Sequence, residues 1–224
     1  MVHVTTKIER ARPEDVEALS RFSVATIHEA QGRIGAVSSK IRPLDRSMSF
    51  CGSAFTVKCA PRDNIMLQVA ISYAMPGDVI VVSAGEYAEA GFFGDVLANA
   101  CVAKGITALV IDSGVRDTRE IIELGFPVFS LSVCVAGTVK ESLGRINEPI
   151  VLGGQLVRPG DIIRGDADGV VIVRREDAAE VARKSKERED AEAGYIAAYK
   201  AGKSVIEVSN LAGILAAKGL TTDE

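Results

Sequence analysis

The sequence predicts one α/β domain with a β-rich second layer and a C-terminal helical arm. Between residues 52 and 135, short apolar runs rich in strand formers alternate with helical segments, as in a sheet whose strands are joined by helices. From residue 138 to 176, short β-rich runs are separated by Pro-Gly-Asp and Asp-Ala-Asp-Gly turns, which favours antiparallel strands. A long polar helical pattern follows, so we expect the domain to cover residues 1–176 and the arm to cover residues 177–224.

Composition and charge exclude several classes of protein. The 224 residues are 47% hydrophobic and 25% charged, which is ordinary for a globular core. The net charge is −4 and no basic run stands apart from acidic neighbours, so neither nucleic acid nor an anionic membrane is expected as a partner. The four cysteines lack CxxC spacing, which disfavours a zinc site or a disulfide scaffold. Without an apolar leader or a long apolar run, the expected location is the cytoplasm.

The expected elements follow from their capping and turn residues. A first helix opens at Pro13 with acidic residues in its first turn, and Thr26 to Glu29 fits a capping box for a second helix that ends near Gly32. The expected strands cover residues 52–60, 79–82, 107–111 and 128–135. The helices between them are expected at 65–73, 95–103 and 118–124, and the arm helix at 178–201. Residues 112–114, Asp-Ser-Gly, are interpreted as a turn after the third strand.

The segment LVIDSGVRDTRE, residues 109–120, places charged residues where a buried strand ends and a helix begins. The preceding helix from Asp95 rises about 15 Å, and the strand that follows it returns over about 20 Å. Arg116 and Asp117 are therefore expected beside Asp95. The first backbone N–H groups of that helix should point into the same place, which makes it an anion site.

Spacing alone leaves two interpretations of this cluster open. Asp117 and Glu120 fit a capping box, and Asp95 is a good helix N-terminal residue, so the cluster could be two capped helices. Arg116 favours a site instead. A cap does not need a guanidinium next to it, whereas a substrate carboxylate benefits from a bidentate partner.

Other polar residues have both a functional and a structural interpretation. His28 could be catalytic, but inside a capping box it is more often a helix residue with satisfied hydrogen bonds. Lys58 lies on a strand, and nothing beside it indicates a Schiff-base amine. Residues 62–64, Arg-Asp-Asn, could reach a distal substrate carboxylate or could form a turn. Asp166 and Asp168 are expected in a turn.

The spacing of Asp95, Arg116-Asp117 and Glu120 resembles the signature of class II pyruvate aldolases and of the related RraA-like proteins. These aldolases act on 4-hydroxy-4-methyl-2-oxoglutarate and 4-carboxy-4-hydroxy-2-oxoadipate. The resemblance extends in order through TIHEAQGRIG, APRDN, PGDVIVVS, GFFGDVLANA, ALVIDSGVRDTRE, TVKESLG and PGDIIRGDADGVVIVRR. It covers residues from about 23 to 175, and the arm is also similar. It implies an RraA-like, β/β/α layered core of the swivelling-domain type.

The resemblance implies a catalytic site with a divalent cation, Mg²⁺ or Mn²⁺, held by Asp117. Pyruvate would chelate the metal, Arg116 would stabilise the enolate oxygen, and Asp95 would orient waters that act as acid or base. Oxaloacetate decarboxylation would pass through the same enolate. The substrate-binding residues implied in this way are Arg116, Gly94, Asp95, Val96, Leu97 and Asn64.

The resemblance also implies a shared site in a homotrimer or homohexamer. Counting back from the end of the arm helix, Glu192 best matches an arm glutamate that completes the neighbouring subunit's site, and Glu189 is the alternative. A different function stays open, because some RraA-like proteins regulate a ribonuclease by association. Those relatives are shorter, and the arm of this chain therefore favours the aldolase.

Overall fold

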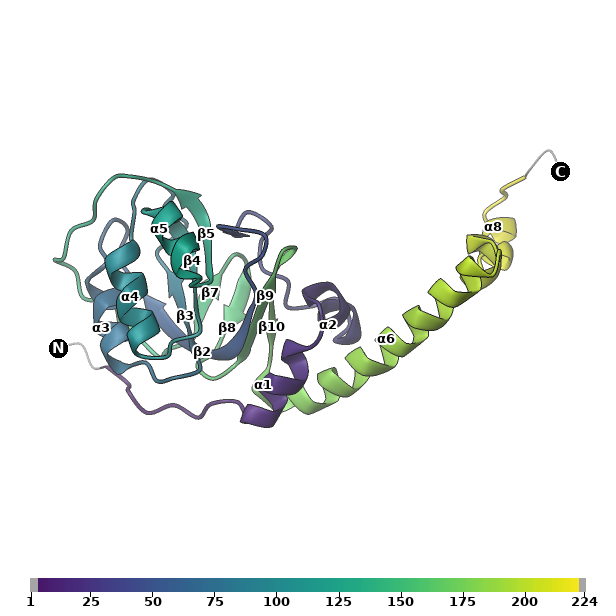
Figure 1. Ribbon diagram of the computed structural model, residues 1–224, viewed down its shortest axis with the longest axis horizontal. Helices are drawn as coiled ribbons and strands as arrows, with labels where there is room; N and C mark the ends of the chain where they lie inside the picture. The colour runs from purple at the N-terminus through teal and green to yellow at the C-terminus, as the bar shows by residue number, and fades with distance from the viewer. Residues whose placement is uncertain (1–3, 222–224) are drawn as a thin grey trace.

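A mixed β-sheet forms the centre of the molecule in the computed structural model, which describes residues 4–221 (Figure 1). Within those residues the sheet has eight strands. Its middle is parallel and consists of β2 (Phe50–Lys58), β3 (Asp78–Ser83), β4 (Ala108–Val115) and β5 (Val128–Val133). The short β1 (Arg42–Pro43) pairs antiparallel with β5 at one edge. The predicted alternation of strands and helices is confirmed.

The region predicted to be antiparallel β extends this sheet and adds a hairpin. The strands β9 (Ile162–Asp166) and β10 (Gly169–Val173) continue the sheet beyond β2, and β6 (Arg145–Ile146) pairs with the end of β2. A separate hairpin joins β7 (Ile150–Leu152) to β8 (Gln155–Val157). Leu152 and Val157 are fully buried in the main core, so the hairpin is the second β layer.

Three helices connect the parallel strands and form the other layer (Figure 1). They are α3 (Ile65–Tyr73), α4 (Asp95–Ala103) and α5 (Thr118–Leu124), with the bounds that the sequence predicts. Gly105 and Gly125 follow α4 and α5 with φ of +71° and +73°, a conformation that glycine adopts at no steric cost. The α/β/β layering positions the carboxyl ends of four parallel strands at one edge.

The start of the second helix differs from the prediction. The helix α1 (Pro13–Ser20) opens as expected, but α2 (Val24–Ala30) is capped by Ser23, whose Oγ accepts from the Thr26 N–H at 3.1 Å. Glu29 pairs with Arg33 at 3.1 Å and does not reach back to Thr26. The capping box at Thr26 is therefore wrong. Val24 is buried against the second core cluster, and burying it begins the helix earlier than the polar pattern indicates.

The strand β4 runs through the residues that the sequence presents as a turn. Asp112 and Ser113 are buried and point to the loop after β3, where Asp112 accepts from the Ala84 N–H and the Ser113 hydroxyl donates to the Tyr87 carbonyl. Because the loop satisfies these polar groups, the strand continues to Val115 with a register shift after Ile111. Burial raises the pKa of the Asp112 carboxyl, although those hydrogen bonds oppose the shift.

The arm is a long helix, α6 (Ala178–Lys200), that follows the 3-10 turn η1 (Arg175–Asp177). Its first turns pack against α1 and α2, and its outer half projects away from the body (Figure 1). Two short helices, α7 (Val205–Val208) and α8 (Ala212–Ala217), lie at its tip. Between residues 4 and 221, no helix is both long enough and apolar enough to cross a bilayer.

Candidate functional site

A cavity of about 390 Å³ lies at the carboxyl ends of the parallel strands. Its walls come from the start of α3, from residues 91–97, from Arg116 and Asp117, and from residues 137–140 of the loop after β5. The sequence-predicted residues that line it are Asn64, Gly94, Asp95, Val96, Leu97, Arg116 and Asp117. The structure thus brings together every predicted site residue except Glu192.

The extension of β4 brings the two charged segments together. Residues 91–93 run beside the end of β4, where the Phe92 N–H donates to the Gly114 carbonyl at 2.9 Å. The Arg116 N–H donates to the Phe93 carbonyl, also at 2.9 Å. Through these bonds, residues 91–93 form a short parallel extension of the sheet beside the end of β4. They place the start of α4 directly beside Arg116 and Asp117, as the chain path predicts.

Asp117 does not cap its own helix. Its backbone is left-handed, with φ of 54° and ψ of 41°, and its side chain makes no capping bond to α5. Instead, Asp117 Oδ2 accepts from the Asp95 N–H at 3.3 Å and lies 3.8 Å from Arg116 Nε. Glu120 pairs with Arg119 at 2.7 Å. The capping-box interpretation is wrong, because the left-handed backbone turns the carboxylate toward the start of α4.

Gly94 permits this close approach. A Cβ at Gly94 would lie 2.2 Å from Asp117 Oδ2, and a Cβ at Gly91 would lie 3.1 Å from the Arg116 Cδ. Any side chain at Gly94 would displace the carboxylate. Gly94 is therefore required by the packing of Asp117 against the chain, whereas a Cβ at Gly91 would first meet the Cys134 carbonyl oxygen, at 2.5 Å.

The start of α4 contributes a carboxylate and backbone N–H groups. The helix has Gly94 as its N-cap residue without a side-chain cap, so Asp95 is its first residue and not its cap. The Asp95 N–H is used by Asp117, which leaves the amides of Val96 and Leu97 to face an anion at a positive helix end. The Asp95 carboxylate makes no hydrogen bond or ion pair with any residue from 4 to 221, and it lines the cavity.

Asn64 lines the cavity, and Asp63 beside it holds the loop after β5. Asn64 Nδ2 donates to the Phe92 carbonyl at 2.8 Å, and Asn64 Oδ1 accepts from Gln68 at 3.1 Å, so both ends of this amide are engaged. Asp63 is buried and accepts from the N–H groups of Glu141 and Ser142. Burial alone would raise the pKa of Asp63, but the hydrogen bonds from the N–H groups of Ile65, Glu141 and Ser142 outweigh it and hold that pKa below its usual range. The predicted turn, residues 62–64, thus acts as a clamp: its Asp63 carboxylate holds the loop after β5 in place.

Three further residues with polar side chains line the cavity without having been predicted: Gln68, Thr138 and Lys140. The signal for the last two was present, because the segment TVKESLG follows a strand that ends at the same edge of the sheet as the other site residues. Gln68 carried no signal, because it lies one helical turn beyond Asn64 on an otherwise apolar helix.

The donor set of the cavity fits a hard divalent cation. In the described part of the chain, no group of three or more His, Cys, Asp or Glu side chains is arranged to hold a metal ion. Asp117 and Asp95 nevertheless offer carboxylate oxygens in a partly open cavity. Mg²⁺ is commonly bound by one or two carboxylates, with the remaining positions taken by water and substrate oxygens.

The other candidates lie elsewhere. Glu192 is on the projecting half of α6 and pairs with Arg188 at 2.8 Å. His28 Nδ1 lies 3.0 Å from the Ile34 carbonyl and does not line this cavity. Lys58 donates to the Ser83 hydroxyl at 3.0 Å. Asp166 accepts from Asp168 N–H in a tight turn, as predicted.

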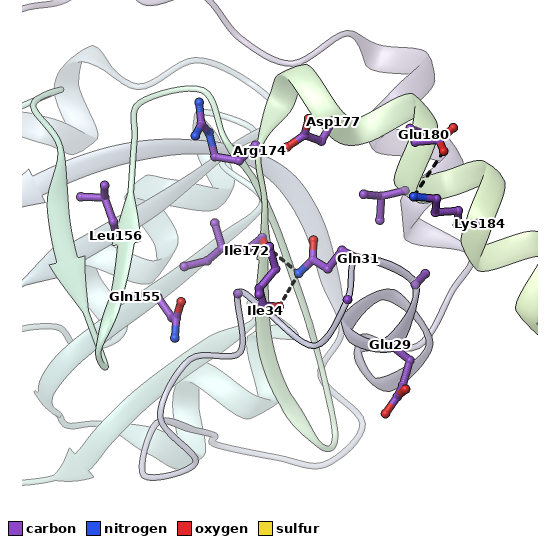
Figure 2. Close-up of a pocket in the computed structure, with 14 residues that line it drawn as sticks. Glu29, Gln31, Ile34, Gln155, Leu156, Ile172, Arg174, Asp177, Glu180 and Lys184 are labelled. Carbon is purple, nitrogen blue, oxygen red and sulfur yellow. Dashed lines mark hydrogen bonds and ion pairs between the residues drawn. The ribbon is translucent and has the colours of Figure 1, made fainter.

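A larger cavity of about 610 Å³ lies at the root of the arm and shares no lining residue with the candidate site. Figure 2 shows Gln31 turned toward Ile34 and Ile172, whose carbonyls its amide donates to, and Lys184 turned toward Glu180. This cavity contains none of the predicted site residues, and these polar groups are already paired. We therefore place the candidate site at the strand ends.

The chain belongs to the RraA-like family, since the family model described as Aldolase/RraA matches residues 24–172. A protein of Halalkalibacterium halodurans with the name "Putative 4-hydroxy-4-methyl-2-oxoglutarate aldolase" is 36% identical over 163 residues, which cover 73% of this chain and 78% of that protein. The predicted RraA-like resemblance is confirmed.

Solved structures confirm the predicted fold. Streptomyces coelicolor RraAS2, described as an unusual member of the RNase ES inhibitor RraA protein family, is similar with a TM-score of 0.73 and 30% identity over 82% of this chain and 96% of that one. An uncharacterized protein from Pseudomonas syringae has the same fold, with a TM-score of 0.77 at 24% identity, covering 90% of this chain and 100% of that one.

Proposed function

We propose that this protein is a divalent-metal-dependent aldolase. It would cleave 4-hydroxy-4-methyl-2-oxoglutarate or 4-carboxy-4-hydroxy-2-oxoadipate to pyruvate and a second oxo acid, with oxaloacetate decarboxylation as a side activity. The observation that carries the proposal is the orientation of Asp117. Its carboxylate leaves its own helix and joins Arg116, Asp95 and a helix N-terminus in one cavity. The name of the relative from Halalkalibacterium halodurans supports the same activity.

Asp117 would hold the cation, Mg²⁺ or Mn²⁺, with Asp95 close by. When bound, the cation would supply positive charge beside the keto oxygen, where negative charge develops during carbon–carbon cleavage. A single direct carboxylate leaves coordination positions for the two oxygens of a 2-oxo acid.

The residues of the chain would supply the remaining chemistry. The Arg116 guanidinium would donate to the keto oxygen and stabilise the enolate more than the ground-state ketone. The amides of Val96 and Leu97 would bind the adjacent carboxylate at the positive end of α4. Asp95, whose carboxylate is not engaged by another described residue, would accept the proton of the C4 hydroxyl directly or through a water. Gly94 keeps Asp117 in position.

The arm would complete the site of a neighbouring subunit in a homotrimer or homohexamer. Glu192 lies far along α6 from its own body, and the same segment exposes Tyr195, Ile196 and Tyr199. A helix with this exposed apolar stripe is suited to lie along another chain. Glu189 is the alternative to Glu192.

A regulatory function is the competing proposal, supported by the described relationship of RraAS2 to inhibitors of a ribonuclease. Binding a partner protein does not require the arrangement of Asp117, Asp95 and Arg116, so catalysis separates the two functions. Purified protein is incubated with Mg²⁺ and each oxo acid, and pyruvate is followed with lactate dehydrogenase. Pyruvate release that stops with a chelator and returns with Mg²⁺ is expected. Absence of cleavage of every substrate, with correctly folded protein, would reject the aldolase.

A further inference from the structure

Two cationic side chains, Arg116 and Lys140, line the cavity at the strand ends in the part of the chain that the structure describes. Arg116 is close to Asp117, with 3.8 Å between Nε and Oδ2, and serves the end of the cavity that holds the carboxylates. Lys140 comes from the loop between β5 and β6. Its ammonium group makes no hydrogen bond or ion pair with any residue from 4 to 221. It is therefore available to an anion that enters the cavity.

The neighbouring amides are less suited to this role. Asn64 donates to the Phe92 carbonyl, and Gln68 donates to Asn64, so these side chains hold the wall together. Each amide keeps a second N–H, but its position is set by its bond in the wall and it carries no charge. Among Asn64, Gln68, Thr138 and Lys140, only Lys140 carries charge.

The main chain on both sides of Lys140 is fixed. On one side, the Val139 N–H donates to the Arg62 carbonyl at 2.9 Å. On the other, the buried Asp63 carboxylate accepts from the N–H groups of Glu141 at 2.7 Å and Ser142 at 2.6 Å. The loop thus presents Lys140 from an anchored base, while the flexible stem lets the ammonium adjust its reach.

The chemistry of the proposed substrates requires a second anion partner, and this step rests on the proposed aldolase function. Each substrate carries one carboxylate beside the keto group and at least one more at or beyond C4. The first is accounted for by Asp117 with its cation and by the amides of α4. The second would enter the cavity without a partner. We propose that Lys140 binds this distal carboxylate and so determines the preference for oxo acids that carry it.

The test compares Lys140→Met with Lys140→Arg and with Lys40→Met. Lys40 is also exposed and makes no ion pair within residues 4–221, but it does not line the cavity, so it is the matched control. Each variant is measured with 4-hydroxy-4-methyl-2-oxoglutarate and with 4-hydroxy-2-oxopentanoate, in which a hydrogen stands in place of the distal carboxylate and the C4 methyl is kept. We expect Lys140→Met to reduce the preference for the first substrate by about 10- to 100-fold, mainly through KM, as for loss of a hydrogen bond to a charged group. Lys140→Arg should restore most of it, and Lys40→Met should retain it.

A binding measurement separates this inference from the aldolase itself. Calorimetric titration in Mg²⁺ compares 2-oxoglutarate, which has a distal carboxylate, with 2-oxopentanoate, which lacks one. If wild type binds 2-oxoglutarate more tightly and Lys140→Met loses this preference, the role of Lys140 is supported. The same binding result without cleavage of any substrate would reject the aldolase activity alone. Equal preference in wild type and Lys140→Met, whether measured by cleavage or by binding, would overturn the role of Lys140.

Discussion

The candidate site at the strand ends, which we call the corner (residues 94–97, 116 and 117), and the outer half of the arm helix both carry paired charges. The chain holds these charges in different ways. At the corner, Asp117 stands on left-handed backbone, its carboxylate accepts from the Asp95 N–H, and the Arg116 main chain is bonded to Phe93. On the arm, Glu192 pairs only one helical turn away, with Arg188. The corner is therefore preorganised within one chain, whereas the arm is organised only as a helix. The first is suited to the small ligand that we propose, and the second would need the surface of another chain to take part in binding.

Asp117→Ala tests the corner at its centre and should have the largest effect. We expect cleavage to fall by about 10³-fold or more, because the cation would lose its protein ligand. The free energy of unfolding should fall by only about 1 kcal/mol, since no capping bond is lost and the main cost is that of alanine on left-handed backbone. Pyruvate release and thermal unfolding measure both. If Asp117→Ala keeps most of its activity at saturating Mg²⁺, Asp117 is not the ligand of the cation.

Arg116→Lys should reduce kcat/KM by about 10²-fold or more, because a point charge does not replace two parallel donors at the enolate oxygen. Oxaloacetate decarboxylation should fall in parallel, since both reactions form the same enolate. Steady-state kinetics with both substrates checks this. If decarboxylation is unchanged while cleavage falls, Arg116 contacts only the departing half of the substrate.

Glu192→Ala tests whether the arm acts on a second chain, and we expect a loss of about 10²-fold, as for removal of an acid–base group. Glu192→Ala and Asp117→Ala oligomers should each be nearly inactive. Mixing them after dissociation and reassembly should restore part of the activity, because some interfaces then combine an intact Asp117 with an intact Glu192.

The exchange of subunits in that mixture is verified by mass-tagged chains. Mixed oligomers that stay inactive despite verified exchange would argue against a shared site, as would full activity of Glu192→Ala alone. Glu189→Ala is the matched variant one helical turn earlier, and it separates the two arm glutamates. Loss in Glu189→Ala with activity kept in Glu192→Ala would transfer the role to Glu189.

Gly94→Ala tests whether the fixed position of Asp117 is important for activity. An added Cβ would lie 2.2 Å from Asp117 Oδ2, so the carboxylate must move. We expect kcat/KM to fall by about 10- to 50-fold, because small displacements in a site are costly. Gly137→Ala is the control on the same cavity, since its Cβ would meet nothing within 4 Å. Equal kinetics for both variants would mean that the position of Asp117 is not critical.

Asp63→Asn examines the clamp beside the corner and should have the smallest effect on activity. Asp63 has a folded-state pKa below its usual value of 3.8, so its carboxylate stabilises the fold above that pH and loses this contribution as pH falls through the lower value. The difference in unfolding free energy between wild type and Asp63→Asn should be constant from about pH 7 to 5 and shrink below about pH 4. Urea unfolding at each pH measures it.

The arm provides the comparison for Asp63. Asp190→Asn removes one partner of an exposed ion pair with Lys186 on α6, and exposed pairs contribute little to stability. We expect its unfolding curve to match wild type at every pH. A pH-dependent gap for Asp190→Asn as large as that for Asp63→Asn would show that burial of the acceptor is not what distinguishes the two regions.

Local patterns were enough to predict most of the fold. The helices α3, α4 and α5 have the predicted bounds, and glycine follows the last two as expected. The closeness of Asp95 to Arg116 and Asp117 also followed from chain length alone, because a helix and the strand after it return to the same edge. These features are determined by neighbours in the sequence, which is why the sequence predicts them.

Tertiary contacts decided the rest. Asp112 and Ser113 look like a turn, but the loop after β3 satisfies their polar groups and keeps them in β4. Asp117 looks like a cap, but the nearby start of α4 offers its carboxylate a different N–H group. The segment TVKESLG indicates only that Lys140 follows a strand of the sheet, and its place at the cavity depends on the clamp by Asp63, which lies far earlier in the chain. A polar side chain forms hydrogen bonds with the partner that folding brings within reach. Because that partner is distant in the chain, the adjacent residues do not predict it.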